Sequence, residues 1–213
     1  MRISELAEAT GVSVATIKYY LREGLLPEGR KLTQRLVDYD ARHVRRLGLL
    51  RLLREVGQVP VEGLKRLVRV VGEADLSIHE MFAAAAYALC PTPPPAGPGR
   101  PVARGLADRL IAQAGWSNIR PDSPDRDNLA SVLEQIGTYD THPRDPAEVA
   151  PYLRFADEIA RYELGHLDDT KDRQGLLEEM VVGQVVFGQL LATLRRLAEE
   201  HHSLNRFGTD HRR

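Results

Sequence analysis

Residues 11–24 of this chain read GVSVATIKYYLREG, and this stretch decides the fold of the N-terminal region. Gly11 supplies the positive φ that a tight turn requires. Ser13 is a preferred N-cap residue, and Gly24 is typical of a helix end. The stretch therefore predicts a tight turn followed by a short helix over residues 14–23.

A second short helix is expected immediately before this turn, over residues 5–10, with Ser4 as its N-cap. Ala7 lies four residues before Gly11 and is small enough to let the two helices cross closely. The positions that face the crossing are apolar and comprise Leu6, Val12, Ile17 and Leu21. Two short helices joined in this way predict a helix-turn-helix.

The helix over residues 14–23 has two distinct faces. Val14, Ile17 and Leu21 follow the i, i+3, i+7 spacing of a buried stripe. The opposite face comprises Ala15, Thr16, Lys18, Tyr19 and Arg22. Its cations can bind phosphates or guanine edges, and its hydroxyls can bind phosphates. This face is typical of a recognition helix that enters the major groove of duplex DNA.

The segment over residues 25–39 predicts a β-hairpin wing. It begins with Pro27 and Gly29, which favour turns, and returns through Leu36 and Val37. Between them stand the basic and amide side chains Arg30, Lys31, Gln34 and Arg35. A wing of this kind is expected to lie against the DNA backbone beside the recognition helix.

Three further helices are expected before residue 90. Asp40 caps a long helix over residues 41–56, and Pro60 suits the first turn of a helix over residues 61–71. Ser77 and Glu80 form a capping box for a helix over residues 78–89.

The N-terminal pattern resembles the MerR family of regulators. The resemblance rests on Ile3-Ser4-Glu5-Leu6-Ala7, Gly11-Val12-Ser13, Thr16-Ile17-Lys18-Tyr19-Tyr20, Glu23-Gly24-Leu25-Leu26-Pro27 and Tyr39-Asp40, in order over residues 1–71. It implies a homodimer that binds a near-palindromic promoter and distorts it so that RNA polymerase can engage. It also implies that Lys18, Tyr19 and Tyr20 are recognition-helix positions and that Lys31 contacts phosphate from the wing.

The wing departs from the family pattern. The family usually has Gly-Tyr-Arg where this chain has Arg35-Leu36-Val37, so Arg35 or Gln34 is expected to replace the usual contacts. The full set of expected DNA-binding residues is Ser13, Thr16, Lys18, Tyr19, Tyr20, Arg22, Arg30, Lys31, Gln34 and Arg35.

Charge supports this assignment. The whole chain has a formal charge of −1, yet residues 1–71 carry 14 Lys and Arg against 8 Asp and Glu, which gives +6, and residues 72–213 carry −7. A basic module joined to an acidic one is typical of a nucleic-acid-binding protein with a second, separate function.

Composition predicts the remaining organisation. Residues 91–101 are proline-rich and should form an extended linker. The expected fold is mainly α: a winged helix-turn-helix with a small β-hairpin over residues 1–72, a short connecting helix over 73–90, and an all-helical domain over 102–213. In that domain we expect helices over residues 102–114, 128–136, 151–166 and 173–200, the last apolar on nearly every face over 180–191.

Several other chemistries are disfavoured. Cys90 is the single cysteine, so neither a disulfide nor a thiolate metal site is expected, and Glu163 with His166 lacks the second pair that a di-metal site needs. The sequence contains no recognisable Ser/His/Asp arrangement and no phosphate-binding glycine loop, so we expect no enzyme activity and no cofactor. No apolar run of membrane-spanning length and no signal peptide are seen, which predicts a cytoplasmic protein.

The role of the second domain stays open between two hypotheses. It could sense a small-molecule effector, with Trp116, Tyr139, Tyr152, Phe155, Tyr162 and Phe187 lining a pocket or simply forming core. Alternatively, it could recruit a protein partner while the first domain tethers it to DNA. Because the helix over 78–89 is short and alanine-rich, we expect the segment over 173–200 to supply much of the dimer interface.

Overall fold

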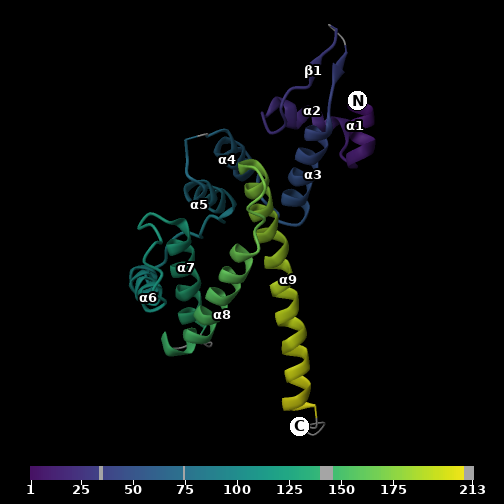
Figure 1. The fold of residues 1–213 in the computed structure, drawn as a ribbon. Coiled ribbons are helices and arrows are strands. Elements are labelled where there is room, and N and C mark those ends of the chain that lie inside the picture. The colour runs from purple at the N-terminus through teal and green to yellow at the C-terminus, as the bar shows by residue number, and fades with distance from the viewer. Residues whose placement is uncertain (34–35, 74, 140–145, 209–213) are drawn as a thin grey trace. The chain divides into compact units, whose positions relative to one another are not determined.

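The computed structural model describes residues 1–33, 36–73, 75–139 and 146–208 (Figure 1). The chain forms two compact units. Unit 1 comprises Met1–Ala74 together with Lys171–Arg213, and unit 2 comprises Asp75–Thr170. The expected division into residues 1–72 and 102–213 therefore needs correction, because the last helix returns to the N-terminal unit and the helix over 78–89 belongs to unit 2.

The N-terminal helices form the expected helix-turn-helix. It consists of α1 (Ile3–Thr10) and α2 (Val14–Arg22), and Gly11 between them has a φ of 67°. The Oγ of Ser13 caps α2 by accepting a hydrogen bond of 3.1 Å from the Thr16 amide. The expected Ser4 cap of α1 is wrong: α1 begins earlier because the Glu5 carboxylate accepts a 2.7 Å hydrogen bond from the Arg2 amide.

A small antiparallel hairpin follows, as expected for a wing. Strands β1 (Arg30–Lys31) and β2 (Val37–Asp38) pair with Arg30 opposite Asp38 and Lys31 opposite Val37. Gly29 precedes β1 where a Cβ would lie 2.5 Å from the Val37 side chain, so only glycine fits this close approach.

Two longer helices complete the N-terminal part of unit 1. They are α3 (Ala41–Glu55) and α4 (Val61–Gly72), and Asp40 caps α3 as expected, accepting from the Arg42 amide at 2.9 Å. The core between these helices and the helix-turn-helix is built from large aliphatic side chains. Its fully buried members include Leu6, Ile17, Leu25, Leu47, Leu53 and Leu64.

The last helix, α9 (Arg173–Phe207), packs its N-terminal third against α3. Leu177 and Val181 are fully buried, and Val185 lies against Gly57 at the end of α3. The Arg173 guanidinium also donates to the Glu73 carbonyl at 3.2 Å. The helix extends seven residues beyond the expected end and, by length and composition alone, is apolar enough to cross a membrane.

The distal part of α9, from Phe187 onward, is exposed in this chain, whereas Met180 and Val181 are buried. We define the α9 stripe as the exposed side chains Phe187, Leu190, Leu191, Leu194, Leu197 and Leu204. Their exposed fractions rise from 44% at Phe187 to 70% at Leu204. The described part of the chain leaves these side chains without a packing partner.

Unit 2 consists of α5 (Ile78–Leu89), α6 (Arg100–Gln113), α7 (Pro124–Tyr139) and α8 (Pro146–Gly165). Helices α6 and α7 pack through small side chains, with Ala103, Ala107 and Ala130 forming the buried cluster. The α7 helix begins four residues before the expected start because Pro124 suits a first helical turn. The α8 helix begins at Pro146, before the expected start at Pro151, and so contains this proline. Pro151 has no backbone N–H to donate, so the helix forms without that hydrogen bond.

Most of the aromatic side chains expected to form core or to line a pocket in the C-terminal segment are exposed. Tyr139, Tyr152, Phe155, Tyr162 and Phe187 are all exposed. Trp116 is half-buried, and its indole N–H donates to Asp157 at 2.9 Å. Cys90 is half-buried, donates to Asp125 at 3.0 Å and accepts from the Asn128 amide at 2.7 Å.

Candidate nucleic-acid interface

The α2 helix buries one face and presents the other to solvent. Ile17 is fully buried on the inner face, while Lys18 and Arg22 are exposed on the outer face. Thr16 and Tyr19 are half-buried at the edges of the outer face. The sequence pattern thus brings together four of the expected recognition-helix side chains on one surface, because successive turns of α2 place them in register.

The position of Arg22 is set by its neighbours. Its guanidinium lies over the Tyr19 ring, 5.2 Å from the centroid, and its Nε is 3.5 Å from the Glu23 carboxylate. Glu23 is also bound by Lys65 of α4 at 2.8 Å, and this hydrogen bond holds the pKa of Glu23 below its ordinary value. Glu23 is therefore ionised and already paired with Lys65, so it only partly offsets the charge that Arg22 presents.

Tyr20 lies in the core rather than on the outer face. Only 6% of the residue is exposed, and burial raises the pKa of its hydroxyl. Its carbonyl accepts hydrogen bonds from the Leu25 and Leu26 amides at 2.9 and 3.2 Å. Tyr20 thus positions the start of the wing segment. Its place three residues after Ile17 puts it on the buried stripe, a signal that the spacing already contained.

Ser13 and Thr16 bind each other at the N-terminus of α2. The Ser13 Oγ is 2.9 Å from the Thr16 Oγ1 in addition to its capping bond. The Ser13 hydroxyl is therefore engaged in ending the turn, and its contribution to DNA contact is expected to be indirect. Thr16 keeps lone pairs for a second partner.

The wing presents Arg30 and Lys31 to solvent. Arg30 donates to Asp38 at 3.2 Å, and the Met1 amino group binds the same carboxylate at 2.6 Å. Bonds from the Met1 amino group and Arg30 hold the pKa of Asp38 below its ordinary value. These contacts tie the wing to the start of the chain. Gln34 and Arg35 lie outside the described residues.

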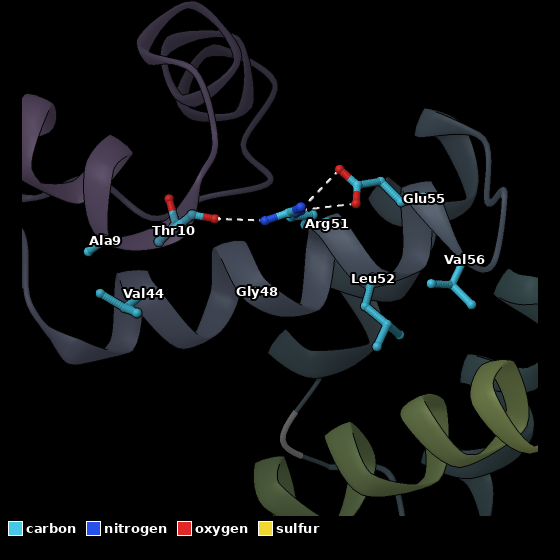
Figure 2. A pocket seen from close by; sticks show the side chains of 8 residues that line it. All are labelled: Ala9, Thr10, Val44, Gly48, Arg51, Leu52, Glu55 and Val56. Carbon is cyan, nitrogen blue, oxygen red and sulfur yellow. Dashed lines mark hydrogen bonds and ion pairs between the residues drawn. The ribbon is translucent and has the colours of Figure 1, made fainter.

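Two arginines of α3 that the sequence reasoning missed hold the helix-turn-helix in place. Arg46 is buried and donates to the Leu25 carbonyl at 3.2 Å, and burial lowers its pKa. Arg51 donates to the Thr10 carbonyl at the end of α1, at 3.3 Å, and to Glu55 at 3.0 Å (Figure 2). Local sequence gave no signal for the two carbonyl contacts, because Leu25 and Thr10 lie 21 and 41 residues away from Arg46 and Arg51.

Figure 2 also shows a cavity beside Arg51. Its volume is about 400 Å³, and it lies between the end of α1 and the face of α3 that contains Gly48. The lining residues are Ala9, Thr10, Val44, Gly48, Arg51, Leu52, Glu55 and Val56. The Arg51 guanidinium in this lining is engaged with the Thr10 carbonyl and the Glu55 carboxylate.

The charge difference between the two halves of the sequence persists between the two folded units. Unit 1 carries 21 Lys and Arg against 15 Asp and Glu, a formal charge of +6, and unit 2 carries 8 against 15, or −7. Among the described residues, no group of three or more His, Cys, Asp or Glu is placed to hold a metal ion. The basic unit is thus the one that contains the recognition-helix face.

The fold and this exposed basic face define the class of protein: a winged helix-turn-helix protein that binds DNA. A family model described as MerR HTH family regulatory protein matches residues 1–70. A solved structure, that of the transcriptional regulator candidate SCO5550 from Streptomyces coelicolor A3(2), is similar to this chain. The two sequences are 37% identical, the TM-score is 0.73, and the match covers 98% of each chain. Residues 1–70 thus match the helix-turn-helix of MerR-type regulators, and the whole chain is similar to SCO5550.

The curated relatives match only part of this chain. The mercuric resistance operon regulatory protein of Bacillus cereus is 32% identical over 81 residues, which is 38% of this chain and 61% of the relative. The nodulation protein NolA of Bradyrhizobium elkanii is 45% identical over 56 residues, 26% of each protein. The chain thus matches about three fifths or less of these relatives, whereas the likeness to SCO5550 extends over both units.

Proposed function

We propose that this chain is a cytoplasmic, sequence-specific regulator that binds a promoter as a homodimer and acts on RNA polymerase there. The observation that carries the proposal is the outer face of α2, where Lys18 and Arg22 are exposed beside Tyr19 on a unit of positive charge. Side chains of these types read guanine edges and bind phosphates in the major groove. Arg30 and Lys31 on the wing add backbone contacts.

The proposal is tested with a duplex selected from random sequences by the full-length protein. Lys18→Ala combined with Tyr19→Ala is expected to weaken binding to that duplex at least 100-fold in a gel-shift titration, since each lost contact costs about 1–3 kcal/mol. The matched control is Arg109→Ala with Tyr139→Ala, which removes an exposed cation and an exposed tyrosine from unit 2. Equal affinities of the two double variants in this titration would contradict the assignment of α2 as the recognition helix.

Homodimer formation is supported by the α9 stripe. Phe187, Leu190, Leu194, Leu197 and Leu204 alternate at spacings of three and four residues, the heptad pattern of a coiled coil, with His201 completing the series. Covering the stripe would remove apolar surface of both copies from water, and homodimer interfaces are more apolar than the rest of a protein surface.

The order of side chains in this series favours an antiparallel pair. Reversing one copy about the point between Arg195 and Arg196 places Leu194 against Leu197, Leu190 against His201 and Phe187 against Leu204. Every layer then contains at least one aliphatic side chain. A parallel pair would instead place two His201 imidazoles together in the interface, at a desolvation cost.

The pairing is tested by analytical ultracentrifugation of the full-length protein. Leu194→Asp is expected to shift it to monomer, because the substitution places two carboxylates in the apolar interface. Ala192→Asp lies on the same exposed turn of α9 outside the stripe and should leave the dimer intact. A dimer that survives Leu194→Asp would show that copies pair elsewhere.

We further propose that unit 2 carries the signal to which the regulator responds. The acidic charge of unit 2 separates it from DNA contact, which leaves sensing or recruitment as its role. The adaptor alternative is supported by the exposed side chains of Tyr152, Phe155 and Tyr162 on α8. For an adaptor, Phe155→Asp should abolish the effect on transcription in a reporter strain while leaving operator affinity unchanged.

A further inference from the structure

A second cavity lies within unit 2, where the proline-rich segment meets α6 and α7. Its volume is about 690 Å³, within the range of small-molecule sites. The apolar part of its lining comprises Pro94, Pro95, Pro98, Val102, Leu106 and Leu133. Val102 is 77% exposed, so this wall presents an aliphatic side chain that no other described group covers.

The walls of this cavity are held by one ion pair. Arg100, at the start of α6, donates to Glu134 of α7 at 2.9 Å, and both side chains are about 85% buried. The same guanidinium lies 3.5 Å from the Pro94 carbonyl, which ties the proline-rich segment to both helices. Gly97 permits this arrangement because a Cβ there would lie 2.7 Å from the Glu134 carboxylate.

The polar groups of the lining indicate what the cavity would accept. Among its described lining residues, the charged side chains are Arg100 and Glu134, and they neutralise each other. Ser131 is 3% exposed, and its Oγ has no hydrogen-bond partner among the described residues. An unpartnered buried hydroxyl is costly, and an oxygen acceptor that comes within reach after a change of its χ1 rotamer would recover that cost.

We propose that this cavity binds a neutral, mainly apolar small molecule with a hydroxyl or carbonyl oxygen, which accepts a hydrogen bond from Ser131. The proline-rich wall supports this use, because proline rings present a preformed apolar surface with little conformational freedom to lose. The identification of the bound molecule as the effector rests on the proposed function of unit 2. The binding of the molecule to the cavity is independent of that function.

The test uses Nile red, a neutral and mainly apolar dye with a carbonyl oxygen, and the full-length protein. Gly137 lies on α7 in the cavity lining with open space around it, so Gly137→Phe should fill the cavity without a clash. Val132→Phe places the same side chain on an exposed position of α7 outside the lining and is the control. The α9 stripe offers the dye another surface, so the difference between these variants reads the cavity.

The expected result is saturable, blue-shifted dye emission that Gly137→Phe weakens at least tenfold and Val132→Phe leaves unchanged. Val102→Phe, at the other wall, should weaken it as well, which guards against a folding defect in one variant. Ser131→Ala should weaken binding about threefold to tenfold while leaving the melting temperature equal or higher, since it removes an unpartnered hydroxyl.

Two results would overturn the proposal: no saturable binding by the wild type, or equal binding by the Gly137→Phe and Val132→Phe variants. A lower melting temperature with unchanged binding in Ser131→Ala would remove the role of the hydroxyl. The Lys18→Ala, Tyr19→Ala double variant should bind the dye normally. Failure of DNA recognition and failure of the cavity are therefore seen in separate measurements.

Discussion

The helix pairs of the two units are packed by different means. In unit 1, α1, α2 and α3 meet through large aliphatic side chains such as Leu6, Ile17 and Leu47, which are fully buried. In unit 2, α6 and α7 meet through Ala103, Ala107 and Ala130, with Leu129 and Leu133 partly buried against them. The neighbouring Ser131 hydroxyl is buried and has no hydrogen-bond partner among the described residues. The packing in unit 1 holds the exposed face of α2 in place, whereas a cavity lies beside the packed helices α6 and α7 of unit 2.

This difference matches the tasks that the two units are proposed to perform. A recognition helix must present Lys18 and Arg22 at a fixed spacing, and large interlocking side chains allow few alternative packings. A site for a small molecule needs space and an unsatisfied polar group, and both occur where small side chains bring α6 and α7 together. The size of the side chains at the helix contacts thus differs between the reading surface and the proposed sensing surface.

The largest expected effect is on the packing of unit 1. Leu6→Ala should lower the free energy of unfolding by about 3–5 kcal/mol, because it removes a fully buried side chain and leaves a cavity. Ala130→Gly in unit 2 should cost about 2 kcal/mol, from the lower helix propensity of glycine and the loss of one buried methyl group. Urea denaturation of both variants measures the contrast, and equal losses would contradict the view that unit 1 is the more tightly specified.

Smaller changes in stability are expected at two glycines of unit 1, and the two substitutions should act in opposite directions. Gly11→Ala should destabilise by about 1–2 kcal/mol, because φ is 67° and the new Cβ would lie 2.9 Å from the Arg51 guanidinium. Gly48→Ala on α3 meets open space and should stabilise by roughly 0.5–1 kcal/mol through helix propensity. Thermal melting of each variant gives the sign directly, and a stabilising Gly11→Ala would exclude the observed turn.

The smallest effect concerns the attachment of the wing. The pKa of Asp38 is held below its ordinary value by the Met1 amino group and Arg30, so its pairing stabilises the fold above about pH 4. That contribution is lost as the pH falls below this value and through the lowered folded pKa. Asp38→Asn should therefore melt earlier than the wild type at pH 7, and the gap should narrow as the pH falls below about 4. A gap that stays constant with pH would show that the carboxylate charge has no part in it.

Local signals predicted the N-terminal elements well. The caps at Ser13, Asp40 and Ser77 are confirmed by their hydrogen bonds, and the hairpin wing is confirmed by the pairing of Arg30 with Asp38. The prediction failed where distant partners decide. Arg46 and Arg51 donate to carbonyls in other elements, and five of the aromatic side chains expected to form core or to line a pocket are exposed. Tyr20 is a different case, because its spacing from Ile17 already placed it on the buried side of α2.

The sequence by itself determined the DNA-binding module, because the turn glycine, the Ser13 cap and the period of α2 act over a few residues. The opposite charges of the two units were also readable in it. Only the tertiary structure decided that α9 joins unit 1 across almost a hundred intervening residues and that the proline-rich segment forms a cavity wall. Both outcomes depend on which apolar surfaces meet when distant parts of the chain come together. Because the hydrophobic effect is non-directional, an apolar segment does not specify its distant packing partner.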